Sequence, residues 1–250
     1  MTKRWLSGMF CALAAFWAGE ARAATIVALS PDTQSLIFID VKKVKVTKTV
    51  RLKGDATVAA LRTISFNPGD GQVYGMDASY DLYRITPSTG ASKYTGNIGR
   101  FSEATTRMDC AAFTLDTCRF ATQSGFYAVF NLPKGKNSQI LPALNGLTGK
   151  RVLGVAYDAA SNFLLVEGLT DQLYRVSPPN EGKMVVIGKL GIDVEAPIAF
   201  DILTTGKKAG GYMISKRMLH KVNPGTGKAS KGVAIKKLTT DVTDMVVLDD

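Results

Sequence analysis

The residue types that carry most enzyme chemistry are scarce in this chain. It has one histidine, His220, so imidazoles cannot form a cluster of metal ligands. It contains neither a Gly-x-Ser-x-Gly nucleophile motif nor a phosphate-binding P-loop. His220 lies in the segment MLHKVN, and related segments elsewhere in the chain carry Tyr83, Tyr127 and Tyr174 at that place. This pattern predicts a packed strand residue and not a catalytic base.

Carboxylates are the second group that could do chemistry. Four acids lie at equivalent hairpin positions in two copies of an internal repeat: Asp77, Asp81, Glu167 and Asp171. If the repeats form a closed ring, as argued below, the oxygens of these acids could line one mouth of its central channel and hold Ca²⁺. Aspartate also suits turns and solvated strand ends, which is the simpler explanation. Ser30, Gln123 and Lys216 stand near these places in the other copies, so a symmetric carboxylate cage is not expected. We expect no cofactor.

Cysteine is the third reactive type. Cys11 lies in an N-terminal segment that we expect to be removed, which leaves Cys110 and Cys118 as an even pair. In an exported chain such a pair predicts a disulfide. A hairpin that turns near Asp116 would not place the two residues directly opposite, so the bridge would require a bulge or a wider loop. Two cysteines with no histidine nearby are a weak metal signal.

The first 23 residues predict a secretory signal peptide. Lys3 and Arg4 precede a short apolar segment, which ends in the small-x-small pattern Ala21-Arg22-Ala23. The apolar segment spans about 14 residues, short of the roughly 20 that a membrane-spanning helix needs. We therefore expect residues 24–250 to form one exported domain, periplasmic or extracellular, with no transmembrane segment.

An internal repeat must position these residues. Five segments share two short apolar stretches and, in most copies, a corner with Pro and Gly such as TPSTG, SPPNEG or NPGTG. The second apolar stretch recurs at steps of 44 to 47 residues, at Leu36, Leu82, Phe126, Leu173 and Leu219. Its alternation of side chains predicts a β-strand, and the corners predict turns.

A further strand precedes each hairpin and is centred on Phe66, Phe113, Tyr157 and Phe200. Its fifth copy, TDMVVLDD with Val247 in register, lies at the C-terminal end of the chain. Four strands per unit are typical of a propeller blade, and the displaced strand indicates ring closure. We predict an all-β, five-bladed β-propeller of four-stranded antiparallel blades, closed by the C-terminal strand joining the first blade. The alternative, an open β-sandwich, requires neither equal repeats nor a displaced strand.

Two stretches also resemble a known family. IVALSPDTQSLIFID and RTISFNPGDGQVYGMDASYDLYRITPSTGAS are similar to the bacterial domain of unknown function DUF4394, with its I-A-L opening and its L-Y-x-I-x-P-x-T-G unit. The resemblance is strongest over residues 25–99 and continues more loosely to the end. It implies an exported propeller-like domain and no established activity. The chain departs from the family at Asn67-Pro68, where Arg usually precedes Pro, and over residues 109–130, where only Asp116 and Arg119 match.

Charge is the feature that bears most directly on function. The formal net charge is +10, and about +8 without the predicted signal peptide, which carries three cations and one acid. Residues 41–54 and 202–240 contain no acid, and ring closure would make the two stretches neighbours. One basic sector is therefore expected, and it includes Lys42, Lys43, Lys207, Lys208, Lys236 and Lys237. Such a sector attracts polyanions in a salt-dependent way.

Two classes of function remain. The first is a non-catalytic binding or scaffold module that contacts an acidic polysaccharide, lipopolysaccharide or a surface protein through the basic sector. Export excludes intracellular nucleic acid, and Tyr212 is the single aromatic residue among the C-terminal lysines that could stack on a base. The second is a propeller-type hydrolase or lyase with acids at the channel mouth. The lysines could instead serve solubility and edge protection. The missing catalytic set favours the binding module.

Overall fold

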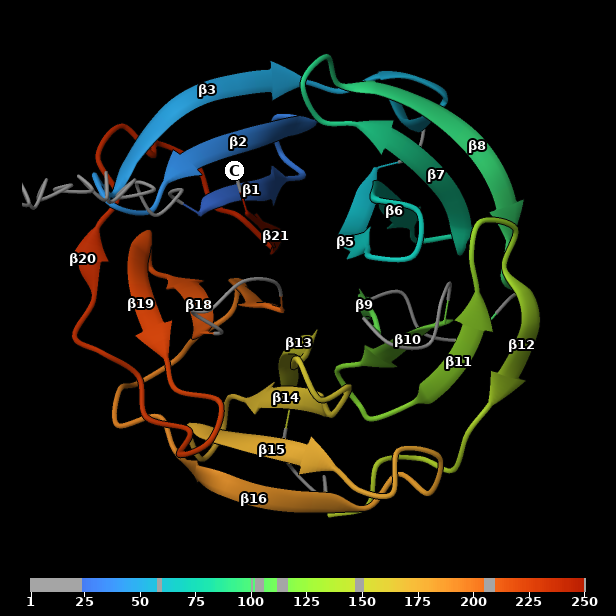
Figure 1. Ribbon diagram of the computed structural model, residues 1–250, viewed down its shortest axis with the longest axis vertical. Helices are drawn as coiled ribbons and strands as arrows, with labels where there is room; N and C mark the ends of the chain where they lie inside the picture. The colour runs from blue at the N-terminus through green and yellow to red at the C-terminus, as the bar shows by residue number, and fades with distance from the viewer. Residues whose placement is uncertain are drawn as a thin grey trace, which may run out of the picture.

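The molecule is a five-bladed β-propeller, as the repeat predicts. The computed structural model describes residues 24–57, 60–99, 101, 106–111, 117–146, 151–204 and 210–249. Five antiparallel sheets are arranged around a central axis (Figure 1). Besides strands, the described residues contain one short 3₁₀ helix, η1 (Asp55–Thr57). None of their helices is long and apolar enough to cross a membrane.

The first blade joins the two ends of the described chain. It contains β1 (Thr25–Ser30), β2 (Ser35–Asp40), β3 (Lys45–Arg51) and, innermost, β21 (Asp244–Leu248). β21 pairs antiparallel with β1, so that Val247 lies opposite Ile26. This pairing confirms that the C-terminal strand closes the ring. Residues 1–23 lie outside the described part, so the signal peptide stays a prediction.

The other blades each run from the axis outwards in chain order. Blade 2 contains β5 (Leu61–Asn67), β6 (Gln72–Asp77), β7 (Asp81–Thr86) and β8 (Ala91–Asn97), with the short β4 (Lys53–Gly54) added in parallel at its edge. Blade 3 contains β9 (Thr106–Cys110), β10 (Thr117–Thr122), β11 (Tyr127–Asn131) and β12 (Lys136–Ile140). Blade 4 contains β13 (Val152–Tyr157), β14 (Phe163–Glu167), β15 (Gln172–Val176) and β16 (Met184–Lys189). Blade 5 contains β17 (Ile198–Leu203), β18 (Gly210–Ser215), β19 (Met218–Val222) and β20 (Val233–Ala234).

The hydrophobic core lies between the blades. Strands near the axis are packed on both faces, and all residues of β13, β14 and β17 are buried. Outer strands such as β16 bury none of their residues fully, because one face meets solvent. One cluster joins Leu173 of blade 4 to Phe200 and Met213 of blade 5, and another joins Leu29 of blade 1 to Ile64 of blade 2. The same inter-blade packing therefore recurs around the ring.

The innermost strand of blade 3 lies earlier than the sequence predicts. The repeat places it around Phe113, but β9 is Thr106–Cys110, and Phe113 and Asp116 lie outside the described residues. Cys110 and Cys118 are directly opposite in the β9–β10 ladder, with their Cα atoms 4.0 Å apart, and form a disulfide. The predicted bridge is confirmed. Of the two expected ways to bring the cysteines together, the structure has the wider connection and not the bulge, because β9 ends at Cys110, β10 begins at Thr117, and Ala111 N donates to Thr117 O (2.9 Å).

Candidate functional site

Three buried aspartates lie on the inner strands that surround the axis: Asp109 on β9, Asp201 on β17 and Asp244 on β21. Each carboxylate accepts a backbone N–H from the inner strand of a neighbouring blade: Ile64 donates to Asp244 (3.1 Å), Tyr157 to Asp109 (2.6 Å) and Val247 to Asp201 (2.7 Å). An inner strand has one edge without a strand partner, and its N–H groups need acceptors when buried. The aspartates supply these acceptors.

Two hydroxyl groups on β5 extend this network. Thr63 donates to Asp244 and accepts the N–H of Met108 (2.9 Å), while Ser65 donates to Asp109 (2.7 Å). Side-chain hydrogen bonds thus link β21 to β5, β5 to β9, β9 to β13 and β17 to β21. At the remaining junction, between β13 and β17, a Cβ added to Gly154 would lie 2.8 Å from the Cβ of Phe200, so the strands approach too closely for a larger residue.

Burial raises the pKa of all three aspartates. It raises the pKa of Asp109 to about 6 and that of Asp244 to about 7, although hydrogen bonds, and for Asp244 the charge of buried Arg107, act in the opposite direction. The pKa of Asp201 is also well above its ordinary value, first through burial and then through the charge of Asp109. The repeat in the sequence does not reveal these three acids, because each occupies a different position in the pairing of its inner strand with the next strand of the blade. The signal that could find them is a lone acid inside an apolar strand, as in IAFDIL.

Two of the acids predicted at the channel mouth cap their own hairpins. Asp77 accepts the N–H of Ser79 (2.8 Å) and the hydroxyl of Tyr83 (3.1 Å). Glu167 is buried and accepts the N–H of Thr170 (2.9 Å) together with its hydroxyl. Burial works against ionisation of Glu167, but these hydrogen bonds outweigh it and lower its pKa. The Asp77 carboxylate therefore accepts hydrogen bonds within the β6–β7 hairpin, and the Glu167 carboxylate does so within the β14–β15 hairpin.

The other two predicted mouth acids fasten neighbouring segments. Asp81 accepts the side-chain amide of Asn97 (2.7 Å), and Asp171 accepts the N–H of Val194 (2.9 Å). One pair of acids lies in blade 2 and the other in blade 4, so the structure does not bring the four together. Within the described residues, no group of three His, Cys, Asp or Glu side chains is arranged to hold a metal ion.

His220 is a packed strand residue, as predicted. It is buried in β19, and its Nδ1 lies 3.0 Å from the carbonyl oxygen of Ser230. A Cβ added to Gly232 would lie 2.6 Å from the imidazole, so glycine is required beside the ring. The histidine therefore has no free access to a substrate on this side.

The two basic stretches meet on the outer rim where blades 5 and 1 adjoin (Figure 1). The segment after β20 runs beside β3. Lys236 accepts the N–H of Val46 (3.0 Å) and donates to the carbonyl oxygen of Val44 (3.0 Å), so that Lys45 and Lys236 form a parallel bridge. We call the lysines of this junction the basic rim: Lys42, Lys43, Lys45, Lys48, Lys236 and Lys237.

Most of the basic rim keeps its charge exposed to solvent. Lys43 pairs with Asp40 at 3.5 Å, and Lys48 donates to the carbonyl oxygen of Ser88 (2.7 Å) while lying over the Phe38 ring. Within the described part of the chain, no ion pair involves Lys45, Lys236 or Lys237. Lys207 and Lys208, which the sequence also assigns to the basic sector, lie outside the described residues.

The molecule is thus a closed propeller with hydrogen-bonded acids at its centre and lysines on its rim. The chain belongs to the family described as Domain of unknown function (DUF4394), whose model matches residues 35–246. This match confirms the resemblance found in the sequence. No curated protein matches the chain.

The chain is similar to several solved structures. A protein of unknown function from Bacteroides thetaiotaomicron aligns with a TM-score of 0.54 at 17% identity, over 88% of this chain and 58% of that chain. A protein of unknown function from Bacteroides caccae gives 0.46 at 9% identity, over 85% and 73% of the two chains. Virginiamycin B lyase from Staphylococcus aureus gives 0.45 at 11% identity, over 84% and 69%. At these identities the likeness concerns the fold alone.

Proposed function

We propose that this protein is an exported, non-catalytic binding or scaffold module that contacts an acidic polysaccharide or a similar anionic cell-surface ligand through the basic rim. One observation carries the proposal. The bridge between Lys45 and Lys236 joins two stretches, residues 41–54 and 202–240, that contain no acidic residue. Lysines far apart in the sequence therefore form one cationic surface.

The geometry of the rim suits an extended polyanion. Lys45 begins β3, and Lys236 lies on the adjacent segment, about 5 Å away in the pairing direction. Lys42 and Lys43 lie in the turn that leads into β3. Lys42, Lys43, Lys236 and Lys237 are all exposed. An array of cations at this spacing can meet successive carboxylate or sulfate groups of a polysaccharide, and its attraction weakens as salt screens the charges.

Catalysis by a hydrolase or lyase mechanism is the less supported alternative. The four acids expected at the channel mouth fasten hairpins and loops, and the three inner acids accept backbone N–H groups. A carboxylate that already caps the fold is poorly placed to bind a metal or to transfer protons to a substrate.

The test is elution of the purified protein from a heparin resin over a NaCl gradient. The variant changes Lys42, Lys43, Lys236 and Lys237 to Gln. A matched control changes four exposed lysines of other blades, Lys93, Lys134, Lys183 and Lys189, to Gln, so that both variants lose the same charge. We expect the wild type and the control to elute well above physiological ionic strength, about 0.15 M, and the rim variant much earlier.

Equal shifts of the two variants would contradict the proposal, because retention would then follow net charge. Elution of all three proteins at low salt would also contradict it and would leave the lysines a role in solubility.

A further inference from the structure

The β18–β19 hairpin differs from its counterparts in the other blades. Its loop consists of Lys216 and Arg217 alone, whereas the equivalent loops span residues 31–34, 78–80, 123–126 and 168–171. Both loop residues are left-handed, with φ of 50° and 60°. Two-residue hairpins of this kind strongly prefer Asn-Gly, because a longer side chain is strained in the left-handed conformation. Strain that the surrounding structure maintains is often found at binding sites.

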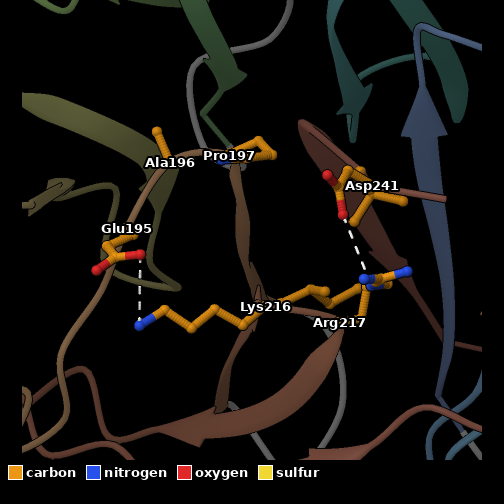
Figure 2. Close-up of a pocket in the computed structure, with 8 residues that line it drawn as sticks. Glu195, Ala196, Pro197, Lys216, Arg217 and Asp241 are labelled. Atoms are coloured by element: carbon orange, nitrogen blue, oxygen red, sulfur yellow. Dashed lines mark ion pairs between the residues drawn. The ribbon is translucent and has the colours of Figure 1, made fainter.

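A pocket of about 180 Å³ opens beside this hairpin (Figure 2). The segments that lead into β17 and β21 form its other walls. Pro197, Ile214 and Val242 give it apolar surface, and Glu195, Lys216, Arg217 and Asp241 give it charged surface. Drug-sized ligands usually occupy roughly 300–1,000 Å³, so this pocket suits a smaller molecule.

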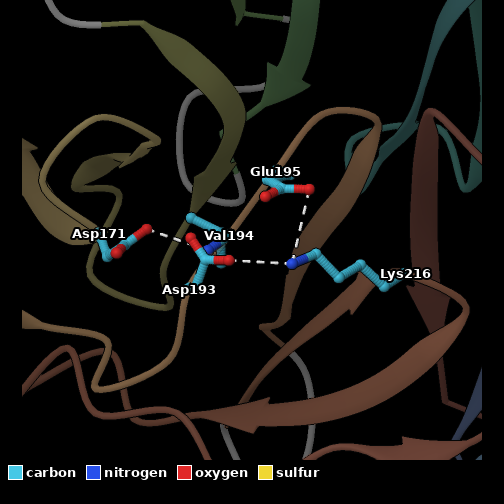
Figure 3. Close-up of polar contacts among 5 residues, drawn as sticks. All are labelled: Asp171, Asp193, Val194, Glu195 and Lys216. Carbon is cyan, nitrogen blue, oxygen red and sulfur yellow. Dashed lines mark hydrogen bonds and ion pairs between the residues drawn. The ribbon is translucent and has the colours of Figure 1, made fainter.

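Lys216 is held in place on one side of the pocket. Its Nζ lies 2.9 Å from Asp193 Oδ2 and 3.5 Å from Glu195 Oε2 (Figure 3). The segment that carries these two acids is fastened by the hydrogen bond from Val194 N to Asp171 Oδ1. Asp171 therefore acts as a positioning residue for this wall. The hydrogen bond to Asp193 raises the pKa of Lys216, which keeps the ammonium group charged.

Arg217 lies on the other side and is held more loosely. Its Nε is 3.8 Å from Asp241 Oδ1, and its Nη1 is 3.5 Å from the carbonyl oxygen of Thr239, distances at or beyond the outer limit of a hydrogen bond. Figure 2 shows Lys216 and Arg217 directed away from each other, so the two ion pairs stand at opposite sides of the pocket. Because it is held loosely, the Arg217 guanidinium group can bind the carboxylate of a ligand through two parallel hydrogen bonds.

The balance of charge around the pocket selects the kind of ligand. Two carboxylates, Glu195 and Asp241, line the pocket with the two cations, and a third, Asp193, pairs with Lys216 beside it, although the chain as a whole is strongly basic. A simple anion would meet excess negative charge there. A molecule with a carboxylate at one end and an ammonium group at the other would satisfy Arg217 and Glu195 together.

We propose that this pocket binds a short peptide with free termini, of dipeptide size. Its C-terminal carboxylate pairs with Arg217, its ammonium group lies toward Glu195, and a small aliphatic side chain packs on Pro197 and Ile214. This site adjoins the segment that carries Lys236 and Lys237, because Ile235 N donates to the carbonyl oxygen of Arg217 (3.1 Å). The proposal uses none of the rim lysines and does not depend on binding of polysaccharide.

The test is titration of the protein with the dipeptide Ala-Val, followed by NMR chemical shifts or calorimetry. Acetylated Ala-Val and Ala-Val amide each lack one terminal charge and serve as matched ligands. The informative variant is Lys216→Asn with Arg217→Gly, which installs the preferred turn residues. We expect saturable binding to the wild type, and binding about tenfold weaker or more for either capped peptide and for the double variant. Lys228→Gln, outside the pocket, should bind like the wild type.

The double variant also tests the strain directly. Because Asn-Gly relieves the left-handed conformation, we expect its Tm to rise by roughly 2–4 °C while peptide binding is lost. A lower Tm would overturn the claim that the hairpin is strained for binding. Absence of saturable binding to the wild type, equal binding of capped peptides, or undiminished binding to the double variant would each overturn the proposed site.

Discussion

Ionisable side chains at the axis of this propeller are buried and hydrogen-bonded, whereas those on the rim are exposed to solvent. Asp109, Asp201 and Asp244 are buried, and each accepts a backbone N–H from the next blade. The rim lysines Lys236 and Lys237 are exposed and have no ion-pair partner among the described residues. A buried charge must be compensated by hydrogen bonds or partners, whereas a solvated lysine requires none. The axis acids therefore link neighbouring blades, whereas the rim lysines are exposed to solvent.

The largest effect is expected at the axis, for Asp244→Leu. The substitution removes the acceptor for Thr63 and for Ile64 N, and it removes the carboxylate that favours the charge of buried Arg107. Removing the carboxylate leaves its buried partners uncompensated, and this should lower the free energy of unfolding by about 3 kcal/mol or more. Urea unfolding of both proteins measures this loss.

Asp244→Asn is the matched control for that substitution. It keeps an oxygen that can accept the N–H of Ile64, so its cost should be clearly smaller. A loss below about 1 kcal/mol for Asp244→Leu would show that the axis acids are not what holds the ring closed.

A second effect is a dependence of stability on pH. The folded-state pKa of Asp109 is about 6 and that of Asp244 about 7, and Asp201 is raised as well. The folded chain therefore binds more protons than the unfolded chain between about pH 4 and 7. Stability should be greatest at the acidic side of this range and fall as the pH rises through 6 to 7, by up to about 1.4 kcal/mol per pH unit for each such proton.

Urea unfolding at pH 5 and at pH 8 checks this slope. Asp244→Asn cannot titrate at this position, so it should flatten the part of the curve near pH 7. Stability that rises between pH 6 and 8 would mean that the axis carboxylates are not held in their protonated form by burial.

The smallest effect is expected on the rim. Changing Lys42, Lys43, Lys236 and Lys237 to Gln should alter the free energy of unfolding by no more than about 0.5 kcal/mol, because exposed charges contribute little to stability. The same urea series measures it beside the heparin experiment. A destabilisation comparable to that of Asp244→Leu would remove the contrast between axis and rim.

Much of the architecture could be predicted from the sequence. Strand type follows from alternation along the chain, and the spacing of Leu36, Leu82, Phe126, Leu173 and Leu219 gives the number of blades. The displaced copy around Val247 gives the closure of the ring. The start of β9 and the register of Cys110 against Cys118 were missed, since they depend on how two strands align across a turn.

The sites depend more strongly on tertiary structure. The sequence alone shows two acid-free basic stretches and an even pair of cysteines. Only the packing of blade 5 against blade 1 brings Lys236 beside Lys45, and only the ring turns Asp109, Asp201 and Asp244 toward their neighbours' backbone. The physical reason is that a residue's periodic position fixes the face of its strand, whereas its burial and partners depend on which distant strand lies against that face.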